Sequence, residues 1–203
     1  MRTEISYSPA FAMATIHLDP GESANAEAGA MMAMSPTVEI ATSTQGGFMK
    51  GLRRSVLGGE SFFMNHFEAT GPDAHVVVAP SLPGDVITWP LSGNTVYLQS
   101  GSYLASPDSI EIDSKWGGAK TFFSKEGLFM LKCSGHGELV VSSYGAVQAI
   151  DLQPGQSYTV DTGHMVGWDE GVSSEVRKVG NWQSTVLGGE GLVVNLTGPG
   201  RVY

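Results

Sequence analysis

The stretch LGGESFFMNHFEATG, residues 57–71, decides the fold because two related stretches follow it along the chain. They read SKEGLFMLKCSGHG at residues 124–137 and LGGEGLVVNLTGPG at residues 187–200. Each combines a turn of glycine and glutamate with an apolar run that is typical of a strand. The glutamates of the three stretches, spaced 66 and then 64 residues apart, are Glu60, Glu126 and Glu190. This regular spacing predicts three repeated units of about 65 residues.

Two other landmarks recur with nearly the same period. A Pro-Gly turn lies ahead of each apolar run, and its glycines are Gly21, Gly84 and Gly155. Proline presets φ and glycine accepts a positive φ, so this pair predicts a type II turn. A short segment centred on a glutamate also recurs, at residues 38–40, 110–112 and 174–176. The three glycines, together with the three glutamates named above, are the predicted structural anchors of the repeat.

The apolar runs carry bulky side chains at consecutive positions, as in Leu128-Phe129-Met130-Leu131. This pattern predicts strands that are covered on both faces, and a single unit would leave one face bare. We therefore expect an all-β fold in which three repeated units pack around a pseudo-threefold axis. Each unit is a β-sandwich or a short double-stranded β-helix. The chain then forms a single compact body, residues 1–203, with repeats at roughly 5–75, 76–140 and 141–203.

The middle unit is longer than the others after its Pro-Gly turn. It takes 17 residues from Gly84 to the next glycine landmark, Gly101, where the other two units take eight. The extra residues surround Pro90–Asn94. The sequence predicts a long hairpin there.

Composition supports a β protein. Twenty-seven glycines and ten prolines among 203 residues are typical of short strands joined by tight turns. No apolar stretch approaches the roughly 20 residues that cross a bilayer, and the first residues lack the apolar centre of a signal peptide. We therefore expect a cytoplasmic protein. The single cysteine, Cys133, lies within an apolar run, which indicates a buried thiol.

The charge balance limits the partners. Eleven lysines and arginines against twenty aspartates and glutamates give a formal net charge of −9. Phosphate binding depends on clustered positive charge, so nucleic acid is disfavoured as a partner. Charged residues make up only 15% of the chain, which is low for a small monomer. We therefore expect other subunits to cover part of its surface.

Candidate chemistry is sparse. The three anchor glutamates could converge on the axis and bind a cation, or each could accept hydrogen bonds from its own turn. The five histidines form no pair with the spacing of metal ligands, and no Gly-x-Ser-x-Gly elbow is present. We therefore expect no catalytic residue, no metal and no cofactor, and we expect that the protein is not an enzyme.

One segment mixes apolar and basic side chains, as a loop at a membrane surface would. It occupies residues 46–54. The residues that form this possible interaction patch are Phe48, Met49, Leu52, Arg53 and Arg54. The exposed side of such a patch would suit another protein or a membrane surface.

The chain also resembles a known family, from about Tyr7 to Leu196. The stretches that carry the resemblance are Glu27–Met31, Gly58–Phe63, Ala79–Asp85, Ser102–Ser106 and Glu126–Phe129. The family comprises bacterial and archaeal proteins of unknown activity that are related to the fungal altered-inheritance-of-mitochondria protein, number twenty-four.

The resemblance implies a fold and an assembly. Family members look like a triplication of the small β-domain of the tryptophan RNA-binding attenuator protein, and they are similar in forming trimers. Three units in each of three chains would give a ring of nine. Mitochondrial members are associated with the organisation of the inner membrane, whereas this chain lacks an Arg-rich, acid-poor leader.

These observations favour a non-enzymatic scaffold or binding protein that forms a homotrimeric, ring-like assembly. One alternative is a β-barrel that binds a small molecule or a metal in clefts between its units, with or without an enzymatic activity. A second alternative is an RNA-binding ring, which would need a basic rim that the acidic composition does not supply.

Overall fold

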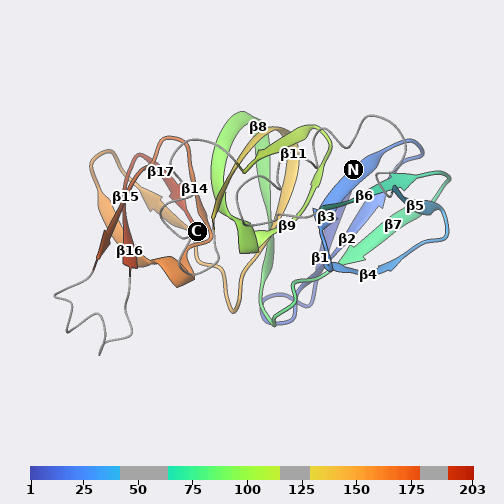
Figure 1. The fold of residues 1–203 in the computed structure, drawn as a ribbon, viewed down its shortest axis with the longest axis horizontal. Coiled ribbons are helices and arrows are strands. Elements are labelled where there is room, and N and C mark those ends of the chain that lie inside the picture. Colours follow the sequence, from blue (N-terminus) through green and yellow to red (C-terminus); the bar gives the residue numbers. More distant parts are fainter. Residues whose placement is uncertain (42–63, 115–128, 179–191) are drawn as a thin grey trace.

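The computed structural model describes residues 1–41, 64–114, 129–178 and 192–203, and these residues form a nearly all-β protein (Figure 1). In the described ranges the helical elements are two single 3-10 turns, η1 (Ser100–Ser102) and η3 (Thr162–His164). The strands form three sheets of four, ten and three strands. The N-terminal strands and the C-terminal strands lie at opposite ends of the molecule, with β8 and β11 between them (Figure 1). The prediction of an all-β fold is therefore confirmed.

The four-stranded sheet belongs to the N-terminal end. Its order is β1 (Arg2–Ser6), β2 (Met13–Leu18), β7 (Ala74–Val78) and β4 (Met31–Met34), with every pair antiparallel. The pattern of β2 explains why it forms a strand: Ala14, Ile16 and Leu18 are buried, and the residues between them are half-buried. This alternation places one face of β2 on the core.

The ten-stranded sheet runs through the whole molecule. Its order is β12 (Ile150–Leu152), β17 (Gly200–Val202), β14 (Gly167–Asp169), β8 (Val86–Gln99), β11 (Met130–Ser142), β9 (Tyr103–Pro107), β3 (Ser23–Glu27), β6 (Met64–Ala69) and β5 (Val38–Ala41). The tenth strand, β10 (Ile110–Asp113), pairs with β11 beside this path. The three-stranded sheet has the order β13 (Ser157–Asp161), β16 (Leu192–Thr197) and β15 (Ser173–Lys178).

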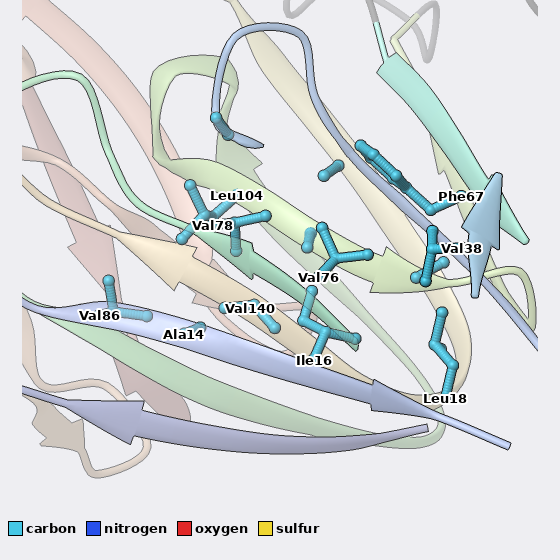
Figure 2. Packing of buried hydrophobic residues seen from close by; sticks show 14 of the residues in the cluster. Ala14, Ile16, Leu18, Val38, Phe67, Val76, Val78, Val86, Leu104 and Val140 are labelled. Atoms are coloured by element: carbon cyan, nitrogen blue, oxygen red, sulfur yellow. The ribbon is translucent and has the colours of Figure 1, made fainter. Parts of the chain in front are cut away.

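The buried hydrophobic residues of the described ranges form three clusters. The first surrounds β2, β7 and Phe67 of β6, and its side chains converge between the sheets in Figure 2. The second lies around β8 and β11 and includes Trp89 and Cys133. The third lies at the C-terminal end around Trp168 and Leu196. The clusters share strands, since Val140 of β11 belongs to the first, Leu131 to the second and Met130 to the third.

Two kinds of repeated landmark contain strands in the described ranges. The runs that follow the glutamate turns contain β6, β11 and β16, and the segments centred on a glutamate contain β5, β10 and β15. In all three cases the two strands pair antiparallel, β5 with β6, β10 with β11 and β15 with β16. The same two sequence landmarks therefore give the same local strand pair three times.

Among the described residues, burial on both faces, which the sequence predicts for all three runs, is seen at the start of β11. At the start of β11, Met130 and Leu131 point to opposite faces and are 2% and 0% exposed, because each lies in a different core cluster. In β16, Val194 and Leu196 are buried while Val193 is half-buried. β6 likewise buries alternate residues at its end.

The predicted hairpin at Pro90–Asn94 is wrong. These residues belong to β8, one strand of 14 residues that pairs with β11 along its length. The register shifts between Ser134 and His136, where β8 carries the extra residue: Gly93 and Asn94 together oppose Gly135 of β11. Pro90 fits in this strand because β14, the other neighbour of β8, pairs only with Val96–Leu98.

Candidate functional site

Three loops lie side by side at one edge of the molecule. They are residues 7–12 between β1 and β2, residues 79–84 between β7 and β8, and residues 143–149 between β11 and β12. The N–H of Ala12 donates to the carbonyl of Gly84 at 3.0 Å, and the N–H of Gly145 donates to the carbonyl of Pro83 at 3.2 Å. The middle loop therefore holds the other two.

A buried carboxylate fixes this arrangement. Asp85, which directly follows the middle loop and precedes β8, is 8% exposed. Its Oδ1 accepts hydrogen bonds from the hydroxyl of Ser8 at 2.6 Å and from the N–H of Val86 at 2.9 Å. Its own N–H donates to the carbonyl of Gly145 at 2.9 Å, and its carbonyl accepts from the N–H of Ser143 at 3.0 Å. Asp85 thus links the first and third loops by hydrogen bonds at the point where the middle loop ends.

The loops approach one another so closely that one position requires glycine. A Cβ atom at Gly84 would lie 1.7 Å from the carbonyl oxygen of Ser143. Gly84 and Gly145 form a parallel β-bridge at the same place. The glycine that the sequence identifies as a repeat anchor therefore serves here as a point of backbone contact.

Four large apolar side chains project from these loops, and we call them the loop surface. They are Tyr7, Phe11, Leu82 and Tyr144, and they are 71%, 73%, 60% and 79% exposed. Tyr7 has a φ of 61°, which is uncommon for a residue other than glycine. The three loops contain no Asp, Glu, Lys or Arg, although the whole chain carries a net charge of −9. The loop surface is therefore apolar, aromatic and uncharged.

A second feature is a hollow of about 390 Å³ on the face of the large sheet where β12, β17, β14 and β8 meet. Arg201 on β17 faces Asp151 on β12, and its Nε–H and Nη2–H donate to the two carboxylate oxygens at 2.7 and 2.9 Å. Asp169 on β14 accepts the backbone N–H of Arg201 at 2.8 Å. The hollow therefore holds two carboxylates and one guanidinium in fixed positions.

The ion pair shifts the pKa values of both partners. The hydrogen bonds from Arg201 lower the pKa of the Asp151 carboxyl. The pKa of the Arg201 guanidinium is raised, first by its hydrogen bonds to Asp151 and second by a hydrogen bond to Tyr203. The aromatic wall consists of Trp89 and Tyr203, whose ring centres lie 4.5 Å apart with an edge-to-face angle of 65°. Pro90 and Asn94 complete the rim. The hollow thus combines charged, amide and aromatic groups.

A third cluster contains a serine, an aspartate and a histidine. Asp108 accepts hydrogen bonds from Ser23 at 2.5 Å and from the side-chain amide of Asn25 at 2.7 Å, and the Nδ1 atom of His66 lies 3.5 Å from its Oδ1. In nucleophilic catalysis the histidine must contact the serine and be oriented by the aspartate. Here the aspartate lies between the other two. The arrangement is that of a hydrogen-bonded surface cluster.

Beside this cluster lies a smaller cavity of about 290 Å³, lined in part by Glu22, Asp108 and Glu138. The Oε2 atom of Glu138 is buried and makes no hydrogen bond with the described residues. Within the described ranges, no three His, Cys, Asp or Glu side chains are arranged to hold a metal ion.

The ammonium group of Met1 and the N–H of Asp19 lower the pKa of the Glu22 carboxyl.

Buried titratable groups lie in the cores. Cys133 is 0% exposed, as the sequence predicts, and burial raises the pKa of its thiol. Tyr103 is also 0% exposed, and burial raises the pKa of its phenol. Its hydroxyl makes hydrogen bonds with the carbonyl of Asn25 and with Ser106. Both groups therefore stay in their neutral forms inside the protein.

The predicted anchors fall into two groups. Gly21 and Gly155 have φ values of 81° and 78° in their turns, whereas Gly84 makes the close backbone contact described above. The second group, the three glutamate anchors, lies outside the described residues: Glu60, Glu126 and Glu190. The whole possible interaction patch also lies outside them: Phe48, Met49, Leu52, Arg53 and Arg54. In the part of the chain that the structure describes, no helix has the length and apolar character to span a membrane.

Sequence reasoning missed the loop surface and the hollow. The sequence does contain a signal for the loop surface, because each of the three loops has a bulky apolar residue in a segment that is rich in Gly, Pro and Ser and lacks charged residues. The sequence contains no such signal for the hollow. Its polar residues, Asp151, Asp169 and Arg201, come from three strands and form no motif.

Comparisons with known proteins give relatives over the whole chain and one family. The chain is 28% identical over 211 aligned residues to an uncharacterized protein of Streptococcus pyogenes serotype M6, and the match covers 100% of this chain and 84% of the relative. An X-ray crystal structure of a Streptococcus pyogenes protein superposes with a TM-score of 0.80 at 26% identity, covering 99% of this chain and 91% of the other. Residues 3–203 match the family described as Mitochondrial biogenesis AIM24, and the chain belongs to this family.

Proposed function

We propose that this protein is a non-enzymatic scaffold that assembles as a homotrimer and docks on a membrane surface through its loop surface. The observation that carries the proposal is the exposure of Tyr7, Phe11, Leu82 and Tyr144 on three hydrogen-bonded loops without a charged side chain. Exposed apolar groups that gather in one place mark contacts with a partner or a membrane.

The chemistry of these side chains favours lipid headgroups. Tyrosine has an apolar ring and a polar hydroxyl, and it is enriched where one end of a side chain is apolar and the other is wet. Since the whole chain is acidic, an anionic membrane would repel it, whereas a neutral lipid surface would not. We therefore expect the loops to enter the headgroup region of neutral lipids.

The size of the patch supports a membrane over a protein partner. A stable protein–protein interface removes about 800 Å² from each partner, across roughly 20 to 30 residues. Four side chains on three short loops provide less than this. In a trimer, three copies of the loop surface would act together, and such multivalency raises the overall affinity.

The repeat and the assembly are part of the proposal. The first and third units contain the same turn: the N–H of Asp19 donates to Oε2 of Glu22 at 2.9 Å, and the N–H of Gln153 donates to Oε1 of Gln156 at 3.0 Å. With the three similar strand pairs, this supports a triplicated unit of the attenuator-protein type. Superposition of the three pairs tests the axis, since a threefold axis relates neighbours by about one third of a turn.

We place this scaffold in the cytoplasm, at the cytoplasmic face of a membrane. No catalytic role is assigned, because the Ser23–Asp108–His66 cluster has the wrong connectivity for a nucleophile. The acidic chain disfavours the alternative of an RNA-binding ring. The alternative of a small-molecule binding protein is supported by the hollow at Asp151, Asp169 and Arg201.

Sedimentation with vesicles tests the docking. The full chain should sediment with phosphatidylcholine vesicles, and less with vesicles that also contain phosphatidylserine. The triple variant Tyr7→Ser, Phe11→Ser, Tyr144→Ser should stay in the supernatant. Tyr158→Ser is a matched control, since Tyr158 is 43% exposed on β13, outside the three loops. Equal sedimentation of the triple variant, or none by the natural chain, would refute the proposal.

Light scattering tests the assembly separately. A trimer has three times the mass of the chain, and the mass should be the same for the natural chain and the triple variant, because the loop surface faces the membrane. A trimer that dissociates in the triple variant would show instead that these loops join the subunits. A monomeric mass for the natural chain would contradict the assembly.

A further inference from the structure

We propose that the hollow formed by β12, β17, β14 and β8 is a binding site for a neutral polyhydroxylated ligand, namely a sugar. The site would be independent of the loop surface and of the proposed docking on membranes. Its principal groups are Asp151, Asp169 and Arg201, with the aromatic side chains Trp89 and Tyr203 as one wall.

The polar groups suit adjacent hydroxyls. A carboxylate presents two acceptor oxygens, a guanidinium presents donors in a planar fork, and a carboxamide presents one acceptor and two donors. Pairs of neighbouring hydroxyls on a sugar ring match such planar groups, because each hydroxyl both donates and accepts. The Oδ1 of Asn94 already accepts the N–H of Ser92 at 2.8 Å, which aims its amide without using its donors.

The charges in the hollow select a neutral ligand. Asp151 and Arg201 neutralise each other through two hydrogen bonds, and Asp169 adds one negative charge. An anion such as phosphate would be repelled by this carboxylate and by the net charge of −9 on the whole chain. A cation would have to compete with the guanidinium of Arg201 for Asp151, and with the backbone N–H of Arg201 for the Oδ2 of Asp169. Hydroxyl groups can bind these carboxylates without displacing the groups that already donate to them, because a carboxylate oxygen accepts more than one hydrogen bond.

The aromatic wall suits the apolar face of a sugar ring. Trp89 is 4% exposed and braces Tyr203 by an edge-to-face contact of 4.5 Å, while Tyr203 is half-buried. Pro90 adds an exposed apolar ring on the same rim. Ring faces of this kind pack against the C–H groups of a sugar while the polar groups bind its hydroxyls.

Size and rigidity fit the same ligand class. Cavities for small molecules range from about 300 to 1,000 Å³, and the hollow measures about 390 Å³. It therefore accommodates one sugar ring or the end of a short oligosaccharide. Asp151, Asp169 and Arg201 lie on strands, and Arg201 is fixed on both its side chain and its backbone. Groups held in this way lose little conformational freedom on binding.

Saturation-transfer NMR on the full chain tests the inference. The probes are glucose, galactose, mannose, N-acetylglucosamine, maltose and lactose, with spermidine and inorganic phosphate as charged comparisons. At least one neutral sugar should give a saturable signal, and Asp151→Ala and Asp169→Ala should each weaken its affinity about tenfold or more. The signal should identify protons of one ring face, which contact the aromatic wall.

A matched control is Glu175→Ala. Glu175 forms a similar exposed ion pair with Arg177 on β15, with its Oε2 at 2.7 Å from Nη2, outside the hollow. This variant should bind the sugar as the natural chain does. Circular dichroism should show the same fold for all variants. Binding of no neutral sugar, binding of a charged probe alone, or sugar binding that survives both aspartate substitutions would overturn the inference.

Discussion

The hydroxyl of Ser8 donates a hydrogen bond of 2.6 Å to the carboxylate of Asp85, which lies 77 residues further along the chain. The same oxygen accepts the N–H of Val86. Asp85→Ala should therefore lower the free energy of unfolding by about 1 to 3 kcal/mol, because two donors lose their acceptor. Urea unfolding followed by tryptophan fluorescence measures this loss.

An exposed aspartate provides the comparison for that change. Asp19→Ala alters a side chain on the surface of a turn and should change the free energy of unfolding by less than about 0.5 kcal/mol. Ser8→Ala should cost about 1 kcal/mol, less than Asp85→Ala, since the bond to Val86 remains. Equal effects of Asp19→Ala and Asp85→Ala would show that the buried carboxylate does not hold the loops.

The contact between Gly84 and Ser143 gives a second prediction. A methyl group at Gly84 would lie 1.7 Å from the carbonyl oxygen of Ser143, so the two loops must separate to admit it. Gly84→Ala should destabilise the fold by about 3 kcal/mol or more. Thermal unfolding measures the change. Gly163→Ala is the control, because its added Cβ meets only the side-chain oxygen of Asp161, at 3.2 Å, and should shift stability by less than about 1 kcal/mol.

The sequence predicted local features of the fold well. Short strands, tight turns and the burial of Cys133 follow from glycine, proline and apolar patterns that act over a few residues. The landmarks at residues 38–40, 110–112 and 174–176 mark strands β5, β10 and β15 for the same reason. Their relation by a threefold axis stays a prediction, as do the roles of Glu60, Glu126 and Glu190.

Long-range pairing was beyond the sequence. Extra residues around Pro90 predict a hairpin when they are considered alone, since proline is rare in central strands. In the structure, β11 supplies a long partner strand and a bulge at Gly93 and Asn94 absorbs one extra residue, so β8 continues as one strand. The hollow depends on such pairing as well, because Asp151 faces Arg201 only through the pairing of β12 with β17.

Glu27 on β3 gives a prediction about pH. Burial raises the pKa of its carboxyl above the ordinary value of 4.5. The folded state therefore holds this proton more tightly than the unfolded state. The contribution of Glu27 to stability is complete below the unfolded pKa and is lost as the pH rises through the raised folded pKa.

Glu27→Gln removes this titration. The variant should gain stability relative to the natural chain as the pH rises from about 4 to about 7, because the natural chain alone acquires a partly buried charge. The urea midpoint, measured at several values across this range, reports the difference. A difference that stays constant with pH, or that shrinks toward neutrality, would contradict the assigned cause.

The thiol of Cys133 provides a test of the central core. It is 0% exposed, packs in the cluster with Trp89, and has a pKa that burial raises, so both access and the thiolate fraction are low in the folded protein. A disulfide reagent should therefore modify it slowly in buffer and rapidly in urea, and its rate should follow the fraction of protein that unfolds. As a comparison, Tyr144→Cys in a Cys133→Ala background places a thiol at a position that is 79% exposed, where modification should be fast without urea. Fast modification of Cys133 in the native protein would mean that β11 separates from its neighbours far more often than global unfolding allows.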